Sequence, residues 1–263
     1  MTWRESRHLA AVALAAATAS ACLLPSFDDV RTQAGSDASP DGPVPEGGAD
    51  ALGDGGLFGC DDISALVIWP MTEGVGSKIR DCNGKYPGTF NGNVSWTTGR
   101  NGLAALQFSG GSVSIVDDAA LRVVGPFSVA AWIAPSSTQT DQFGDVIARY
   151  ESISTAAWDL TVTQDPSVSL TLFSGNITQA TAPIAFDKWV HVVGVYDAGN
   201  ASIFVNGNVV QSGPGPTSLP PIPTPITLGA NAVGTSVYHG KLAGLRIYTR
   251  VLTSGEVKTL ASK

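Results

Sequence analysis

Paired carboxylates are the first chemistry to look for in this chain, because hydrolysis of a glycosidic bond generally needs two of them about 5 to 9 Å apart. The five glutamates are spread over the length of the chain and form no cluster: Glu5, Glu46, Glu73, Glu151 and Glu256. Asp159 is the one acid inside a segment with clean strand alternation, Trp158–Thr163. An active pair would require Asp145 or Glu151 to converge on Asp159 from a separated strand. We therefore do not expect an enzyme.

Histidine and cysteine patterns offer no better-supported chemistry. His191 lies in an apolar segment, which favours a packed imidazole over a catalytic base, whereas His239 sits at a predicted turn and is a candidate surface contact. The three cysteines have no neighbouring histidines in a zinc-ligand pattern. We expect neither a metal nor another cofactor.

The charge of the chain is concentrated before residue 60. The formal net charge of −7 argues against nucleic-acid binding, because proteins of that class present basic patches. Residues 23–59 hold seven acids and one arginine, are rich in proline and glycine, and lack any periodicity. Such a segment is typical of a disordered linker. We assign residues 22–59 to this linker and residues 60–263 to a folded, nearly neutral domain.

Residues 1–21 predict a signal peptide for secretion. Two arginines precede an uncharged apolar run over residues 9–21, which is shorter than the about 20 residues that a membrane-spanning helix needs. Its end, Ala19-Ser20-Ala21-Cys22, resembles the lipobox of bacterial lipoproteins, and this implies a lipid on Cys22. Ala19 replaces the usual leucine, so ordinary cleavage near Ala21 is the alternative. The expected location is the bacterial outer membrane or cell surface, or a periplasm-facing position, with membrane contact through the lipid alone.

Secretion would place Cys60 and Cys82 in an oxidising compartment. If Cys22 carries lipid, these two cysteines remain as an even pair that flanks the first predicted strand. We expect a disulfide between them, with two unlinked thiols as the alternative.

Alternation with a period of two dominates from residue 60 onward and predicts an antiparallel sandwich or barrel. Asn206-Gly207 predicts a tight hairpin, and the prolines between 214 and 225 predict an extended loop. Thr253 and Glu256 spell a capping box before one short helix. Trp189–Val195 is apolar in both registers, so we expect it to be covered on both faces. The expected strands are 63–69, 104–109, 112–116, 126–134, 145–150, 158–163, 167–172, 188–197, 201–205, 209–210, 225–230 and 240–249.

The most specific motif of the folded domain is Trp189–Asp197 followed by the Asn206-Gly207 hairpin. Further distinctive stretches are Leu66–Gly76, Asp81–Gly84 with Gly88-Thr89, Leu106–Phe108, Phe127–Ile133 and Leu245–Leu252. Through these stretches, residues 65–260 resemble the LamG-like jelly-roll family of the concanavalin A-like lectin/glucanase superfamily. The resemblance implies an all-β, antiparallel jelly-roll β-sandwich with one short C-terminal helix, preceded by the signal peptide and linker. Most matched residues are core and turn positions, so they specify fold rather than activity.

The resemblance also shows what this chain lacks. Glucanases of the superfamily carry Glu-x-Asp-x-x-Glu on one strand, and this pattern is missing. Relatives commonly hold a structural calcium with acids at positions that Thr72 and Ala243-Gly244 occupy here. Calcium takes six to eight oxygen ligands, and only Glu73 and Asp81 remain. We expect no bound metal, with weak calcium binding at Glu73 and Asp81 as the alternative.

Jelly-roll lectins bind sugars at loop tips or on the concave sheet face, with aromatic rings against the sugar. The candidates at predicted strand ends or turns are Tyr150, Trp158, Tyr238 and His239. We expect a membrane-anchored, non-catalytic module of the bacterial cell envelope that binds glycans. A structural or adhesion module that binds another envelope or extracellular protein is the alternative, and a glycoside hydrolase is less favoured.

Overall fold

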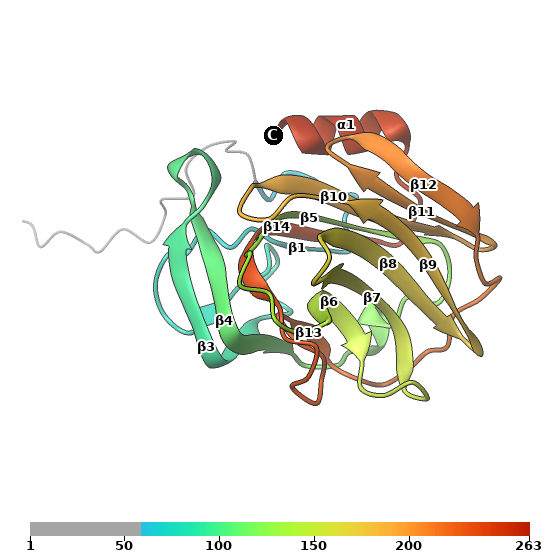
Figure 1. Ribbon diagram of the computed structural model, residues 1–263, viewed down its shortest axis with the longest axis horizontal. Helices are drawn as coiled ribbons and strands as arrows, with labels where there is room; N and C mark the ends of the chain where they lie inside the picture. The colour runs from blue at the N-terminus through green and yellow to red at the C-terminus, as the bar shows by residue number, and fades with distance from the viewer. Residues whose placement is uncertain (1–58) are drawn as a thin grey trace, which may run out of the picture. The chain divides into compact units, whose positions relative to one another are not determined.

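The computed structural model describes residues 59–263 (Figure 1). The predicted signal peptide, Cys22 and all of the predicted linker except residue 59 lie outside the described residues. The described part contains 14 strands and one α-helix. Their bounds are β1 (Val67–Trp69), β2 (Lys78–Ile79), β3 (Gly88–Thr98), β4 (Ala104–Ile115), β5 (Phe127–Pro135), β6 (Phe143–Tyr150), β7 (Ala156–Thr163), β8 (Ser167–Ser174), β9 (Asn176–Pro183), β10 (Val190–Asp197), β11 (Asn200–Val205), β12 (Asn208–Pro214), β13 (Ile226–Leu228), β14 (His239–Tyr248) and α1 (Ser254–Ser262).

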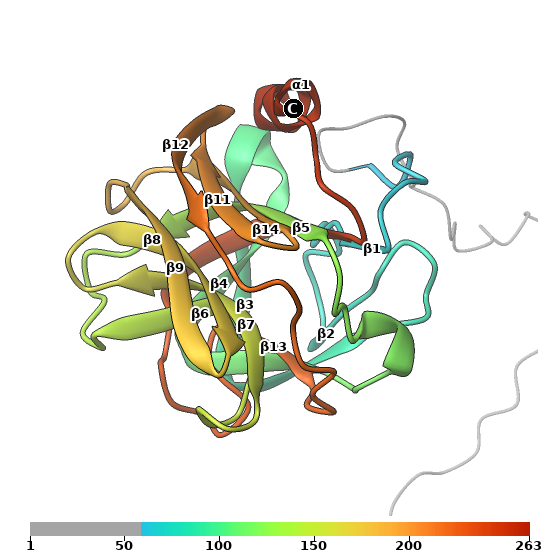
Figure 2. The same cartoon turned by 90° about the vertical axis from the view of Figure 1, so that its right-hand side faces the viewer.

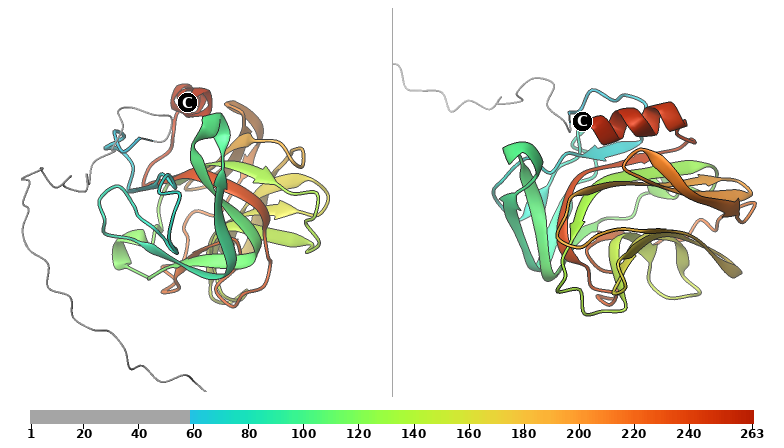
Figure 3. Two further views of the ribbon diagram at one scale, coloured as in Figure 1. Left: turned by 90° about the vertical axis from the view of Figure 1, so that its left-hand side faces the viewer. Right: turned by 45° about the horizontal axis from the view of Figure 1, so that its top comes forward.

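The strands form two antiparallel layers joined through one long strand. The hydrogen-bonded order is β12-β11-β10-β5-β14-β4-β13-β6-β7-β8-β9. The first half of β4 pairs with β14, and its second half pairs with β13. Gly110, with a φ of 103°, and Gly111 lie between these halves. Strand β4 therefore passes from one layer to the other, as strands at the corners of sandwiches do, and Figure 3 shows the two layers face to face.

The core lies between the layers because alternate residues of each strand point inward. On β7, Trp158, Leu160 and Val162 join the core cluster. The ring of Trp158 packs 5.0 Å from the ring of Phe127 on β5, across the interface between the layers. The intervening residues of β7, Asp159 and Thr161, consequently belong to the outer face of the second layer. The all-β jelly-roll sandwich expected from the sequence is confirmed.

Helix α1 covers the outer face of the first layer. Val257 and Leu260 of the helix are buried against Val193 and Val195 of β10 and against Tyr248 of β14. This explains why residues 189–195 are apolar in both registers, since one face of β10 meets the core and the other meets the helix. The capping box is also present, because Thr253 and Glu256 exchange hydrogen bonds at the start of α1.

The beginning of the domain is fixed by a covalent bond. Cys60 and Cys82 form a disulfide with a Cα–Cα distance of 5.4 Å, which confirms the expected pairing. Between them, β1 pairs with β14 along Val67–Trp69. The segment therefore contributes a strand to the first layer.

The sequence does not predict three strands, the two-residue β2 and the longer β3 and β9, and it predicts one strand as two. Strands β3 and β9 expose most of their side chains, so they lack the apolar alternation that reveals a strand. The predicted strands 104–109 and 112–116 form the single strand β4, because the glycines at 110 and 111 bend it without ending it. No helix among residues 59–263 is long and apolar enough to cross a membrane.

Candidate functional site

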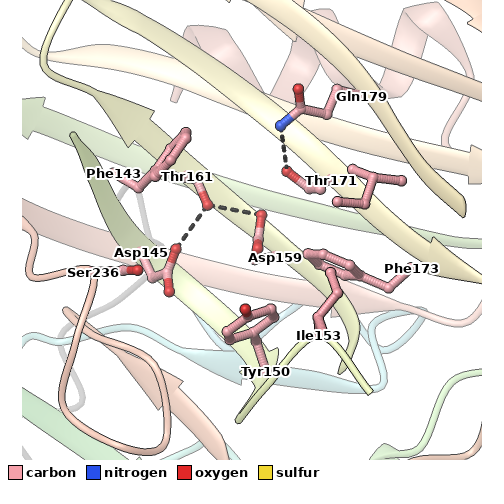
Figure 4. Close-up of a pocket in the computed structure, with 11 residues that line it drawn as sticks. Phe143, Asp145, Tyr150, Ile153, Asp159, Thr161, Thr171, Phe173, Gln179 and Ser236 are labelled. Atoms are coloured by element: carbon pink, nitrogen blue, oxygen red, sulfur yellow. Dashed lines mark hydrogen bonds between the residues drawn. The ribbon is translucent and has the colours of Figure 1, made fainter. Parts of the chain in front are cut away.

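A pocket of about 180 Å³ opens on the outer face of the second layer (Figure 4). Strands β6 to β9 contribute the residues of its floor and walls, and two loops complete it. A protein cavity of about 150 Å³ can hold a benzene ring, so this pocket has room for one small ring rather than for a long chain. The pocket is lined by Phe143, Asp145, Tyr150, Ile153, Asp159, Thr161, Thr171, Phe173, Ile177, Gln179 and Ser236.

Two buried acids share one hydroxyl on the floor of the pocket. The Oγ1 atom of Thr161 lies 2.8 Å from an oxygen of Asp145 and 2.7 Å from an oxygen of Asp159. This follows from the register, because Asp145 on β6 is the direct cross-strand partner of Thr161 on β7, while Asp159 lies two residues earlier on the same face of β7. Asp145 and Asp159 are 3% and 6% exposed.

This arrangement requires a shared proton. A hydroxyl has only one hydrogen, so Thr161 donates to one acid and accepts a hydrogen bond from the other only when that other acid is protonated. Burial, followed by the nearby charge of Asp159, raises the pKa of Asp145 to about 8. Burial also raises the pKa of Asp159, to about 6, against the effect of its hydrogen bonds to hydroxyls. Between these values the pair holds one proton.

The walls of the pocket are apolar and partly aromatic. Phe143, Ile153 and Ile177 are 42%, 62% and 57% exposed, which is high for large hydrophobic residues. The rings of Tyr150 and Phe173 lie 5.2 Å apart. Figure 4 shows Phe143 on one side of the acid pair and Phe173 on the other. The pocket therefore combines a polar, acidic floor with an apolar rim that is open to solvent.

Hydrogen bonds between two loops hold the open end of β6 in place. The backbone amide of Asp145 donates to the Ser236 carbonyl at 2.8 Å. The buried side chain of Gln139 donates to the Val237 carbonyl at 2.9 Å and accepts from the His239 amide at 2.8 Å. A Cβ atom at Gly144 would lie only 2.8 Å from the side chain of Gln139. The absence of a side chain at residue 144 thus allows the two loops to pack against each other.

The structure places one of the four predicted contact residues in this pocket. Tyr150 lines it and is half-buried. Trp158 is fully buried in the core, because it occupies an inward position of β7, and Tyr238 is fully buried with its hydroxyl donating to the Lys241 carbonyl at 3.0 Å. Neither of these two side chains reaches solvent, so both are core residues and the expected ligand contact is not available to them. His239 is half-exposed but does not line the pocket.

The acid pair was not expected from the sequence, which predicted no catalytic residues. Convergence of Asp145 or Glu151 on Asp159 was the condition set for an enzyme, and the structure brings Asp145 and Asp159 together at one hydroxyl. Glu151, the other partner considered, is exposed and lies outside the lining. Phe143, Phe173 and Gln179 line the pocket but were not among the residues predicted from the sequence. The alternation along β8 could have indicated Phe173, because it places Thr171 and Phe173 on the outer face.

His191 is a packed residue, as expected. It is 2% exposed, and its ring lies 5.1 Å from that of Trp132. Burial and the charges of Arg246 and Arg100 lower its pKa to about 3. The imidazole is therefore neutral at physiological pH, and its burial does not suit it to act as a general base.

The two acids considered for calcium bind backbone amides instead. Glu73 accepts a hydrogen bond from the Arg80 amide at 2.6 Å, and the buried Asp81 accepts one from the Tyr86 amide at 2.6 Å. Within residues 59–263, no three His, Cys, Asp or Glu side chains gather in a way that could hold a metal ion. The absence of a metal stays a prediction.

Comparison with known proteins agrees with the observed architecture. A sequence model of the concanavalin A-like lectin/glucanases superfamily matches residues 108–258. No curated protein matches the chain. Domain 4 of AbnA, a GH43 extracellular arabinanase from Geobacillus stearothermophilus, was solved in complex with arabinotriose. It is similar with a TM-score of 0.62 and 20% identity, over 75% of this chain and 98% of that one.

Receptor-binding domains of bacterial toxins share the same architecture. The binding domain of botulinum neurotoxin DC in complex with rat synaptotagmin II gives a TM-score of 0.61 at 15% identity, over 76% of this chain and 51% of that one. The same toxin domain in complex with SialylT gives 0.59 at 15% identity, over 76% and 51% of the two chains. This chain spans about half the length of those toxin chains. At such identities the likeness shows the fold.

Proposed function

The chain belongs to the concanavalin A-like lectin/glucanase superfamily, and from that premise we propose that it is a non-catalytic module that binds glycans in the pocket over β6 to β9. The observation that carries the proposal is the combination of side chains in the lining. Asp145, Asp159 and Gln179 offer hydrogen-bonding groups for hydroxyls, and the rings of Tyr150 and Phe173 offer apolar surface for the face of a sugar. Few polar groups on an apolar background are typical of small-molecule sites.

The same acid pair argues for binding and against hydrolysis. In a glycosidase the two carboxyl groups flank the scissile bond, and the substrate lies between them. Here the Thr161 hydroxyl lies between Asp145 and Asp159 and bonds to both. A glycosidic oxygen cannot take that position while the pair is intact. Incubation with polysaccharides that the protein binds should therefore release no new reducing ends.

Protein binding is the second candidate, and a specific feature favours it. Phe143, Ile153 and Ile177 expose large apolar side chains around one opening. Exposed apolar clusters commonly mark interaction sites, and the similar toxin domain was solved in complex with rat synaptotagmin II. A structural or adhesion role would use this rim against another envelope or extracellular protein.

We further propose that a lipid on Cys22 anchors the protein to the outer membrane or cell surface, and that residues 23–59 act as a tether. The tether joins the domain at Cys60, which the disulfide to Cys82 fixes to the fold. Figure 2 shows β8 and β9 on the opposite side of the domain from the blue segment where the described chain begins. This placement would turn the pocket away from the point of attachment.

The proposal is tested by binding of the purified protein to a broad panel of glycans, with calcium and with a chelator. Ile177→Ala should weaken any binding severalfold, because it removes a rim contact worth about 1 kcal/mol. Val209→Ala is the matched control, since Val209 is 55% exposed on β12 and does not line the pocket. No binding across the panel would reject the glycan proposal and favour a protein partner.

A further inference from the structure

The acid pair in the pocket has no positively charged neighbour. The lining contains no lysine, arginine or histidine. Arg149, which precedes Tyr150 on β6, bonds instead to Asp117 at 2.9 Å and to the Ile222 carbonyl at 2.8 Å. Tyr150 is the one other titratable group in the lining, and β8 and β9 contribute only neutral side chains to it. The shared proton is thus what limits the negative charge on the floor.

Each acid also has a second oxygen besides the one that Thr161 binds. Thr161 bonds to one oxygen of Asp145 and to one of Asp159, and Asp159 is also hydrogen-bonded to the Thr171 hydroxyl. Both side chains are more than nine-tenths buried and line the pocket. In Figure 4 these oxygens lie between Phe143 and the Tyr150–Phe173 ring pair. They can accept hydrogen bonds from a ligand in the pocket.

The walls suit a cation as well. Aromatic faces attract ammonium groups through their π-electrons, and the floor would supply charge-assisted hydrogen bonds, which are about twice as strong as neutral ones. A ligand of this kind replaces the proton of the pair with its own positive charge. A neutral sugar leaves the proton where it is.

We propose that the pocket recognises the free ammonium group of an amino sugar, with the charge on Asp145 and Asp159 and the ring against Tyr150 or Phe173. This inference rests on the proposed glycan-binding function and names its ligand class. The sugar, rather than a simple amine, follows from the size of the pocket, which has room for a small ring beside the acids.

The number of protons released on binding distinguishes this specific interaction from nonspecific binding. Because the pair holds one proton near pH 7, binding of an ammonium group should release up to about one proton per ligand. Calorimetry in two buffers of different ionisation enthalpy measures that number directly. Binding of an N-acetylated sugar should release none, since the amide carries no charge.

The experiment compares glucosamine tetramers with N-acetylglucosamine tetramers on the purified protein at pH 7. We expect the free amine to bind at least about tenfold more tightly, as one charge-assisted hydrogen bond allows. Asp159→Asn and Asp145→Asn should each abolish this preference and the proton release. Asp165→Asn is the matched control, because Asp165 is exposed in the β7–β8 turn and lies outside the lining.

The outcomes separate the inference from the proposed function. Binding to panel glycans without a preference for the free amine, or without proton release, would overturn the inference and leave glycan binding in place. Equal affinity for n-butylamine and for the glucosamine tetramer would overturn the claim that the pocket recognises the sugar ring as well as the ammonium group. No binding to either tetramer, together with no binding on the glycan panel, would overturn both. Circular dichroism of the Asn variants excludes misfolding as the cause of a loss.

Discussion

Asp145 and Asp159 come from neighbouring strands and meet at one hydroxyl, so the two buried carboxyl groups of the pocket hold a proton in common. Thr161 makes this possible by lying 2.8 Å from one and 2.7 Å from the other. The pair gives the pocket a charge that depends on pH and on the ligand. Several measurable consequences arise from this relationship and from the fold that creates it.

The contribution of the acid pair to stability should fall as pH rises. Both acids have a folded-state pKa above the ordinary 3.8, so between pH 4 and 8 this pair binds more protons in the folded protein than in the unfolded chain, and its contribution to the free energy of unfolding decreases with increasing pH. Buried His191, with a pKa lowered to about 3, contributes with the opposite sign below about pH 6.5, so the effect of the pair is read from the difference between variants. Melting curves from pH 5 to 8.5 should show a larger drop in Tm for the wild type than for Asp145→Asn, by several degrees. Parallel curves would contradict the shared proton, and Asp165→Asn should behave like the wild type.

Removal of the bridging hydroxyl should destabilise the protein. Thr161→Val keeps the shape of the side chain but leaves two buried acids without their common partner. We expect a loss of about 1–3 kcal/mol, the cost of unsatisfied buried polar groups. Urea denaturation at pH 7 measures this difference. A variant as stable as the wild type would show that water replaces the hydroxyl without cost.

The alternation that revealed the fold also explains where the site prediction went wrong. Trp158, Leu160 and Val162 share the inner face of β7, and Asp159 and Thr161 share the outer face. The alternation of residues 158–163 therefore puts Trp158 inside wherever Asp159 is outside. Tyr238 lies in the loop before β14, where the sequence has no periodicity, and its burial comes from tertiary packing. Its ring lies 6.0 Å from that of Phe108, and a Cβ atom at Gly240 would lie 2.5 Å from its hydroxyl. The convergence of Asp145 with Thr161 depends on the register of β6 against β7, which is decided by tertiary pairing rather than by local pattern.

The disulfide should contribute roughly 3 kcal/mol, the value that chain entropy gives for a loop of this length. Its two cysteines are 22 residues apart in the sequence. The double variant Cys60→Ser with Cys82→Ser should lose that stability in denaturant titrations. The wild type under reducing conditions should match the variant, and an unchanged midpoint in both would show that the bond adds nothing to stability.

A glycine at the end of β13 should not tolerate a side chain. Gly229 has a φ of 82°, and a Cβ atom there would lie 2.2 Å from the ring of Phe108. Gly229→Ala should therefore cost several kcal/mol through backbone strain and overpacking. Gly234→Ala is the matched control, because Gly234 has a φ of 79° and no atom within 4 Å of the added Cβ. Equal melting temperatures for the two variants would contradict the packing around Phe108.

Membrane attachment should depend on Cys22. If that residue carries the proposed lipid, Cys22→Ala should move the protein from the membrane fraction to the soluble fraction, because one residue bears all the anchoring acyl chains. Fractionation of bacteria that express the two forms measures this directly. Retention of the variant in membranes would contradict the lipid anchor.

The central claim is that the pocket over β6 to β9 is where the ligand binds. Backbone NMR of the isotope-labelled protein, titrated with the tightest glycan from the panel, tests it most directly. The account predicts that the largest shift changes fall on Thr161, Thr171, Phe173 and Gln179, and that Asp159→Asn reduces them. Changes confined to α1 or to the β3–β4 hairpin, with these four amides unmoved, would contradict it.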